Sequence, residues 1–332
     1  MFGLRRFSKR RAEPANDAAA AASAPPRADA EELLRRLEWT VIRRLDGALQ
    51  GDYRTLFRGF GLDLADLREY QAGDDVRHID WNVTARLQSP HVREFQEDRE
   101  VSAWFLLDLS GSVDFGSAGV RKRAVLTSFV AVLARLLTRY GNRVGAVLYG
   151  GQGEGAIPAR TGRRHVLHVL DRIGALRADG KSGETRLGDL LERSLSAIGR
   201  RSVVFVVSDF ISAPGWEQTL GVLAQRHEVV AVRLYDPLEQ ALPDLGLVVL
   251  QDAETGEQLF VDTHDPGFRR RFAAAAAERE TALRKALAEA GVDCLELATD
   301  ERLDQALLHF MRLRRRRSQL VGGLNGPWAR DI

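Results

Sequence analysis

The sequence has few of the features that mark several large classes of protein. It contains one cysteine, Cys294, so it has no internal disulfide and no cysteine-rich metal site, as expected in a reducing compartment. No apolar run reaches the roughly 18–20 residues that span a bilayer, and no apolar segment follows the basic start as it would in a secretory signal. The formal net charge is only +2, unlike that of a globally basic nucleic-acid binder. We therefore expect a soluble, cytoplasmic protein that binds no nucleic acid.

The composition is that of a folded protein with a large core. Of 332 residues, 45% are hydrophobic and 28% are charged, which excludes disorder, collagen and coiled coil for the chain as a whole. We expect four regions. They are a disordered basic and Ala/Pro-rich tail (1–30), an N-terminal extension (31–100), a main domain (101–313) and a basic C-terminal tail (314–332).

Apolar runs separated by helical patterns predict an α/β fold. Buried strands are expected at 103–109, 144–149, 202–207, 228–234 and 292–297, with a short extended piece at 155–160. Helices are expected after Asp29, at 120–140, 163–176, 187–198, 216–225 and 266–290, and in a last segment ending near 317. Continuous apolar strands that alternate with helices indicate a mostly parallel sheet with helices on both faces. Two alternating runs, 247–251 and 258–261, predict a β-hairpin.

Oxygen-bearing side chains follow two of these strands and precede one helix. Asp108, Ser110 and Ser112 end the first strand, Asp209 follows the third, and Thr185 precedes the helix at 187–198. Ligands of open parallel sheets bind beyond the carboxyl ends of the strands. Carboxylate and hydroxyl oxygens are the ligands of hard cations. We therefore predict that these five residues hold Mg²⁺ or Mn²⁺.

Longer stretches carry a family resemblance. The segments LREYQAGDDVRHIDWNVTAR, VREFQEDRE and LLDLSGSVDFG resemble the MoxR-associated family known as domain of unknown function 58. The spacing of Asp108, Ser110, Ser112, Thr185 and Asp209 resembles the metal-ion-dependent adhesion site of von Willebrand factor A domains. The resemblance covers about 33–310, which is most of the chain.

The resemblance implies a von Willebrand factor A-like domain with an N-terminal extension. It also implies that these five residues hold the ion directly or through water, and that an Asp or Glu of a partner completes its coordination. The implied function is that of a non-enzymatic adaptor. It would work with a MoxR-type AAA+ ATPase in the assembly or activation of a client complex.

The segment 51–100 is rich in charges, among them Arg68, Glu69, Asp74, Asp75, Arg77, Asp80 and Arg86. We favour an Arg–carboxylate network that braces the extension on the main domain. The alternative is a docking surface for the ATPase.

Basic residues gather at both ends of the chain. Phe2, Leu4 and Phe7 lie among arginines and suit peripheral contact with an anionic membrane, although a solubilising tail is the favoured interpretation. The run at 312–317 has no interleaved aromatics, which argues against nucleic-acid recognition.

The alternative function is a Mg²⁺-dependent phosphohydrolase with Asp108 as nucleophile. Aspartyl phosphatases on similar sheets need a second acid two residues further on as general acid. That position is Ser110 here, which disfavours hydrolysis.

Overall fold

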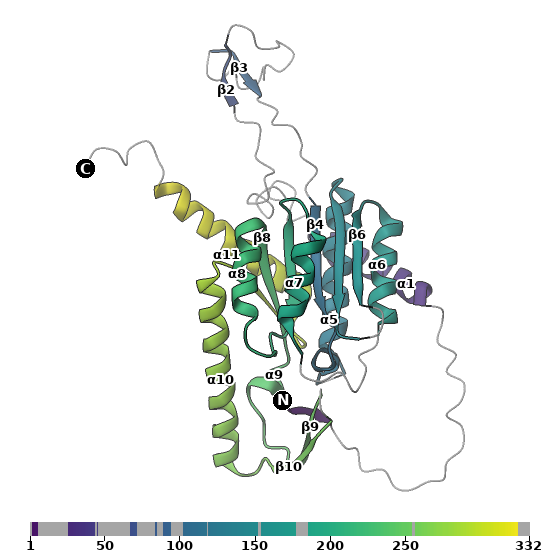
Figure 1. The fold of residues 1–332 in the computed structure, drawn as a ribbon, viewed down its shortest axis with the longest axis vertical. Coiled ribbons are helices and arrows are strands. Elements are labelled where there is room, and N and C mark those ends of the chain that lie inside the picture. Colours follow the sequence, from purple (N-terminus) through teal and green to yellow (C-terminus); the bar gives the residue numbers. More distant parts are fainter. Residues whose placement is uncertain are drawn as a thin grey trace, which may run out of the picture.

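A six-stranded sheet lies at the centre of the molecule (Figure 1). The computed structural model describes residues 2–5, 26–43, 45, 67–71, 84, 89–93, 102–117, 119–151, 154–176, 185–253 and 256–324. In spatial order the strands are β6 (Gly155–Arg160), β5 (Arg143–Tyr149), β4 (Ser102–Asp108), β7 (Val203–Ser208), β8 (Glu228–Tyr235) and β11 (Asp293–Ala298). All pairs are parallel except β5 with the edge strand β6. This order confirms the predicted α/β class with a mostly parallel sheet.

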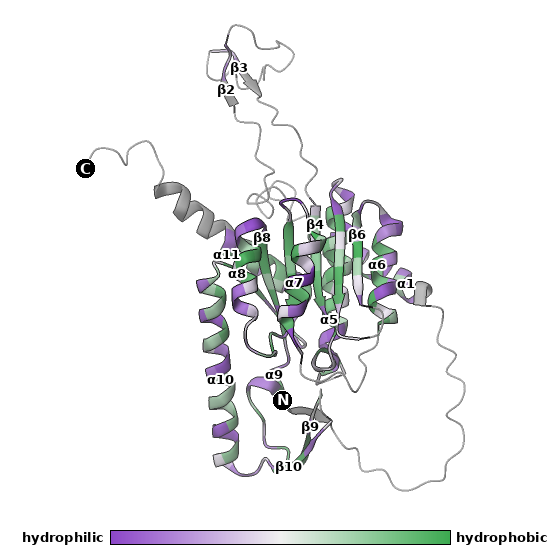
Figure 2. Cartoon of the chain, viewed as in Figure 1, coloured by the Kyte–Doolittle hydropathy of each residue, from purple (hydrophilic) through white to green (hydrophobic). Residues whose placement is uncertain are grey.

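The central strands are continuous apolar runs because both faces of the sheet are covered. All six residues of β7 are buried, and successive side chains point to opposite faces. Phe105, Phe205 and Phe129 form an aromatic cluster on one side, while Trp104 and Leu106 pack on the other. Figure 2 shows the strands of the central sheet mostly in green, whereas purple and green residues alternate along several of the surrounding helices.

Seven helices of the described residues cover the two faces. One core includes residues of α1 (Pro26–Leu37), α5 (Lys122–Arg139), α6 (Arg163–Ala175) and α11 (Leu303–Leu324). The second core includes residues of α7 (Leu187–Ala197), α8 (Trp216–Arg226) and α10 (Pro266–Glu289). Among the residues that the structure describes, no helix combines the length and the apolar character needed to cross a bilayer.

A small second sheet forms beside the central one. The predicted hairpin is present as β9 (Leu247–Asp252) and β10 (Gln258–Asp262). Its third strand was not expected: β1 (Phe2–Arg5) pairs antiparallel with β9, within the region predicted to be a disordered tail. The unpaired edge of β9 offers backbone groups that an extended segment can satisfy, and composition alone does not reveal such a partner.

The helical ends also differ from the sequence prediction. Helix α1 begins at Pro26, not after Asp29, because proline is favoured at the first helical position. It continues into a π-helical turn, η1 (Glu38–Ile42). Helix α11 extends to Leu324 through the expected tail, since its Arg, Gln and Leu residues are strong helix formers.

The N-terminal extension is described only in part. Strands β2 (Leu67–Glu69) and β3 (His91–Arg93) pair antiparallel. Of the residues predicted to form the brace, Arg68 and Glu69 lie in β2, whereas Asp74, Asp75, Arg77, Asp80 and Arg86 lie outside the described residues. The interpretation of that segment as a brace or a docking surface therefore stays a prediction.

Candidate metal centre

Three acidic residues lie at the same edge of the sheet. Asp108 ends β4, Asp209 follows β7, and Asp236 follows β8. The three strands are neighbours and run parallel, so their carboxyl ends meet. Strand order reverses between β4 and β7, which is the place where ligands of such sheets bind. The sequence analysis named the first two residues and missed Asp236.

Asp108 is a buried carboxylate with two internal donors. Its Oδ1 accepts from the Ser110 backbone N–H at 3.0 Å, and its Oδ2 accepts from Ser208 Oγ at 2.7 Å. Burial, together with the negative charge of Asp209, raises the pKa of Asp108 to about 6. Asp108 and Asp209 stand at the carboxyl ends of the neighbouring parallel strands β4 and β7. Asp108 therefore lies where a cation would be stabilised.

The two predicted serines meet in the loop after β4. Ser110 Oγ and Ser112 Oγ lie 3.2 Å apart, and both residues are buried. A 3₁₀ turn, η3 (Gly111–Asp114), brings them together. Gly150 lies against this loop with φ of 108°, and a Cβ at that position would be 2.4 Å from Ser110 N. Only glycine permits this approach.

A buried lysine completes the polar cluster. Lys122 Nζ lies 2.7 Å from Asp209 Oδ2 and 2.7 Å from Glu239 Oε1, and its side chain is 0% exposed. Burial opposes the charge of Lys122, but the two carboxylates outweigh it and hold its pKa above the ordinary value. Asp209 Oδ1 accepts from the Ile211 N–H at 3.0 Å. Lys122 thus acts as a built-in counterion of the predicted ligand Asp209.

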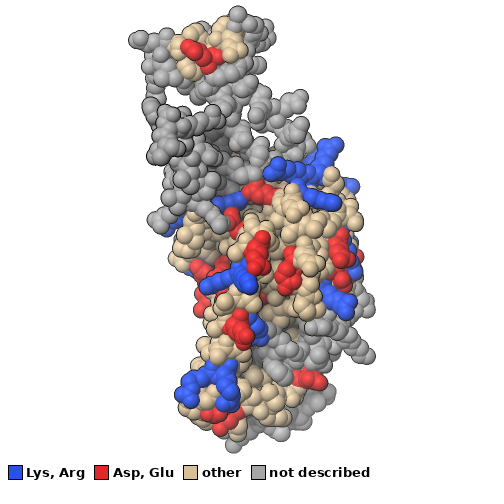
Figure 3. Space-filling view, turned by 60° about the vertical axis from the view of Figure 1, so that its left-hand side comes forward, with Lys and Arg blue, Asp and Glu red and all other residues tan. Residues whose placement is uncertain are grey.

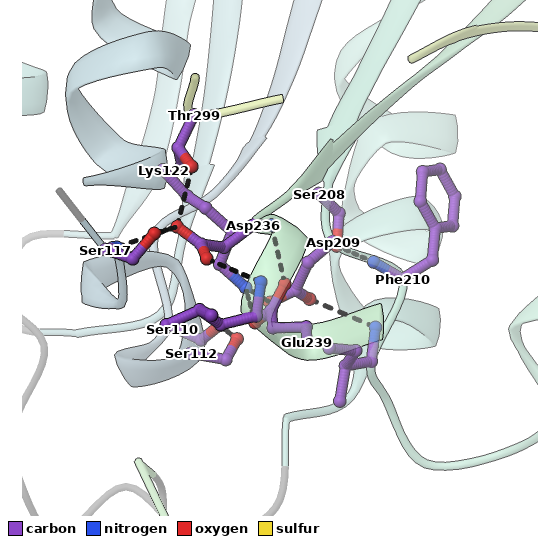
Figure 4. Close-up of polar contacts among 12 residues, drawn as sticks. Ser110, Ser112, Ser117, Lys122, Ser208, Asp209, Phe210, Asp236, Glu239 and Thr299 are labelled. Carbon is purple, nitrogen blue, oxygen red and sulfur yellow. Dashed lines mark hydrogen bonds and ion pairs between the residues drawn. The ribbon is translucent and has the colours of Figure 1, made fainter. Parts of the chain in front are cut away.

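Asp236 joins three loops around this cluster (Figure 4). It accepts hydrogen bonds from Ser117 N and Oγ at 2.7 and 2.9 Å, from Leu238 N at 2.9 Å and from Thr299 Oγ1 at 2.6 Å. Burial works against its charge, but these donors hold its pKa below the ordinary value. Asp236 also caps the short helix α9 (Pro237–Gln240), and its backbone N–H donates to Glu239 Oε2 at 2.9 Å. Glu239 therefore links the cap to Lys122.

Thr185 is placed beside the loop that follows Asp209. Its carbonyl oxygen accepts from Ser212 Oγ at 3.0 Å and from Ala213 N at 2.9 Å. The residue is 4% exposed. The segment that contains Thr185 thus contacts the loop that follows Asp209 through the Thr185 carbonyl group, beside the end of β7.

Phe210 adopts an unusual backbone conformation in that loop. It is the non-glycine residue with positive φ, 57°, among those described, which costs about 1–2 kcal/mol. Its N–H donates to Ser208 Oγ at 2.9 Å, and its ring packs against Trp216 with centroids 5.5 Å apart. These contacts hold the turn that directs Asp209.

The chemistry of these donors fits a hard divalent cation. When ionised, Asp108, Asp209 and Glu239 carry three negative charges, of which Lys122 balances one. The remaining two are those that one divalent ion would neutralise. Within the described residues no group of three His, Cys, Asp or Glu is placed as metal ligands, so such an ion would depend on hydroxyls and water as well as carboxylates.

Lys122, Glu239 and Asp236 are the functional candidates that the sequence analysis missed. Lys122 occurs in the stretch VRKRAV, which has the pattern of an exposed basic helix start. Asp236-Pro237-Leu238-Glu239 has a signal that could have been found, since an acid followed three residues later by Glu is the pattern of a helix cap. Nothing local indicates that both groups turn toward Asp209.

Several known proteins are similar to this chain in sequence. A family model described as "Protein of unknown function DUF58" matches residues 66–282. An uncharacterized protein of Mycobacterium tuberculosis is 38% identical over 283 residues, which are 85% of this chain and 89% of the relative. One of Mycobacterium avium is 34% identical over 160 residues, covering 48% of this chain and 94% of the relative.

Solved structures share a lower similarity. The conserved hypothetical protein BatB from Bacteroides thetaiotaomicron is 13% identical, with 65% of this chain and 99% of that one covered and a TM-score of 0.40. The SpRpn10 VWA domain is 11% identical, with 63% and 94% covered and a TM-score of 0.36. The family match spans more than half of the residues and the mycobacterial relative is similar over most of its length, so this chain belongs to the DUF58 family of proteins of unknown function.

Proposed function

We propose that this protein is a non-enzymatic, cytoplasmic adaptor whose cluster at the carboxyl edge of the sheet holds Mg²⁺ or Mn²⁺. The observation that carries the proposal is the buried Asp108 carboxylate, which lies beside a second carboxylate and next to the paired hydroxyls of Ser110 and Ser112. A divalent ion would supply a positively charged partner for the Asp108 carboxylate. Asp209 and Thr185 would contribute further oxygens directly or through water.

The ion would present an open position to a partner. Small hard cations keep some water ligands, which an incoming carboxylate can displace. The partner would therefore be a protein that presents Asp or Glu. On the family resemblance, the proposed partners are a MoxR-type AAA+ ATPase and its client, with assembly or activation of that client as the outcome.

The contacts of Asp108 do not favour the phosphohydrolase alternative. Both of its carboxylate oxygens accept hydrogen bonds inside the protein. The residue two positions further on, Ser110, has no acidic proton to give to a leaving group. The contacts described for Asp108 therefore support the adaptor over the phosphohydrolase.

The test combines metal binding with partner capture. We expect isothermal titration to detect Mg²⁺ or Mn²⁺ binding to the full chain, and Ser110→Ala with Ser112→Ala to weaken it at least about tenfold, or about 1.4 kcal/mol. Capture of the ATPase should fall in the double variant and in EDTA. Ser194→Ala removes a buried serine in α7 and should change neither. Equal metal binding and capture by the wild type and the double variant would refute the proposal.

A further inference from the structure

A long groove opens beside the candidate metal centre. It has a volume of about 650 Å³, the space of roughly twenty water molecules. One wall is helix α10, and the opposite wall includes Phe210 and Trp216. Ser112 and Asp209 also line the groove, so it is continuous with the candidate metal centre.

The wall formed by α10 is apolar and straight. Its lining residues include Phe272, Ala276, Leu283 and Ala286, which recur at the spacing of one helix face. From the first to the last, this face is roughly 20 Å long. Leu287 is the one buried residue among the 24 of α10. Leu283 and Ala286 pack partly against the second core, whereas Phe272 and Ala276, nearer the start of the helix, are only half-buried. Figure 1 shows α10 standing at the margin of the domain.

One arginine of the groove lacks a close ion-pair partner among the described residues. Arg279 lines the groove in the middle of the α10 face, and it makes no hydrogen bond or ion pair with another described residue, although the negative charge of Glu239 acts on it. The four acidic side chains along the groove are already engaged: Glu280 with Arg233, Asp209 and Glu239 with Lys122, and Glu217 with the Gly215 N–H. Arg279 is thus available to a carboxylate from outside. The surface turned forward in Figure 3 carries interspersed charges of both signs.

We propose that this groove receives an amphipathic helix of a partner protein that carries acidic residues beside its apolar face. The apolar side chains would pack along Phe272, Ala276 and Leu283, since the small alanines allow two helices to approach closely. One carboxylate would pair with Arg279. A second would reach the metal at Asp209, so this part of the inference depends on the proposed function. The length of the α10 face suits about four turns of helix and exceeds what a small ligand needs.

Selected peptides provide a direct probe. Peptides of about 15 residues, the length that matches the groove, are displayed on phage and selected on the full chain in Mg²⁺. We expect the enriched sequences to combine an acidic residue with apolar residues at positions i, i+3 or i+4, and i+7. Affinities of the synthetic peptides are then measured by fluorescence anisotropy. Failure to enrich any peptide, or enrichment of peptides without acidic residues, would overturn the proposal.

Matched variants on α10 locate the binding surface. Ala276→Trp fills the groove, whereas Ala277→Trp places the same side chain at an exposed position outside it. We expect at least about tenfold weaker peptide binding for Ala276→Trp and for Arg279→Gln. Ala277→Trp and Arg270→Gln should bind as the wild type does. Equal peptide affinities of Ala276→Trp and Ala277→Trp would refute the groove as the binding site.

The same peptides separate this inference from the metal proposal. Binding that depends on Ala276 but resists EDTA and the double serine variant would retain the groove and refute the metal-dependent part. Binding that needs the metal but tolerates Ala276→Trp would retain the adaptor and refute the groove. If the wild type sediments as a dimer that Ala276→Trp dissociates, the occupant is a second copy of this chain and the partner helix is refuted.

Discussion

Lys122 Nζ and Asp209 Oδ2 lie 2.7 Å apart in a fully buried ion pair between the first turn of α5 and the end of β7. The same ammonium binds Glu239, so one cation holds two carboxylates from different loops. A lysine in this position supplies positive charge at the edge where a divalent ion is proposed. It therefore sets how much charge is left for that ion to balance.

Replacement of the buried lysine should destabilise the protein strongly. Lys122→Met leaves the buried Asp209 and the partly buried Glu239 without their counterion, and removal of one partner of a buried pair costs about 3–5 kcal/mol. The measurement is the free energy of unfolding in urea. Lys285→Met removes an exposed lysine, whose nearest carboxylate is 3.9 Å away, and should change it by less than about 0.5 kcal/mol. Similar losses of unfolding free energy in both variants would contradict the role of Lys122 as the counterion of Asp209 and Glu239.

Millimolar Mg²⁺ should restore part of the stability of Lys122→Met, because a bound divalent ion would supply the missing charge. The free energy of unfolding is compared with and without Mg²⁺, and Asp108→Asn in the same background should abolish the gain. No gain in Mg²⁺ would show that the carboxylates of this variant do not recruit the ion.

Metal binding should weaken as the pH falls through the pKa of Asp108, about 6. The ion needs the carboxylate, and at pH 5 only about one-tenth of the Asp108 side chains are ionised, so the apparent affinity should be roughly tenfold lower than at neutral pH. Isothermal titration at both pH values measures this difference. Asp108→Asn should remove both the binding and its pH dependence.

Asp108 should change the stability of the protein with pH in the direction opposite to that of most acidic residues. Because the folded-state pKa of Asp108 lies above the ordinary value of 3.8, the folded state holds a proton that the unfolded chain has lost. Without metal, this group therefore makes the protein less stable as the pH rises from about 4 to 6. Urea unfolding of wild type and Asp108→Asn across this range checks the direction: the advantage of the variant should grow with pH.

Asp236 should prove to be a structural acid. Asp236→Ala removes the acceptor of Ser117, Leu238 and Thr299, and we expect a loss of roughly 2–4 kcal/mol in the free energy of unfolding. Asp300→Ala replaces an exposed acid near the same edge and should have little effect. Equal stability of the two variants would show that the three loops hold together without Asp236.

Gly150 should be needed for the serine loop. In Gly150→Ala the new Cβ meets Ser110 N at 2.4 Å in a left-handed conformation, and we expect a loss of about 2 kcal/mol or more. Gly174→Ala tests the same exchange in α6, where a Cβ meets nothing within 4 Å. It should be neutral or stabilise by up to about 1 kcal/mol. Thermal unfolding of both variants measures the contrast, and equal midpoints would refute the close approach.

The sequence by itself determined the α/β class and the positions of the predicted ligands. Apolar runs such as 202–207 fix a buried strand because only a sheet covered on both faces buries every side chain in turn. The polar residues Asp108 and Asp209 directly follow such runs, and parallel strands bring their ends together. These inferences depend on a few consecutive residues and on the rules of sheet topology.

Tertiary structure alone decided what surrounds those ligands. Lys122 has the local pattern of an exposed helix start, yet its ammonium reaches Asp209, 87 positions away, and Glu239, 117 positions away. The pairing of β1 with β9 and the groove along α10 likewise depend on segments distant in the chain. A hydropathy pattern indicates which side of a helix or strand is buried. It does not indicate which charged side chains pair with one another in the interior, because those pairs form only when distant segments pack together.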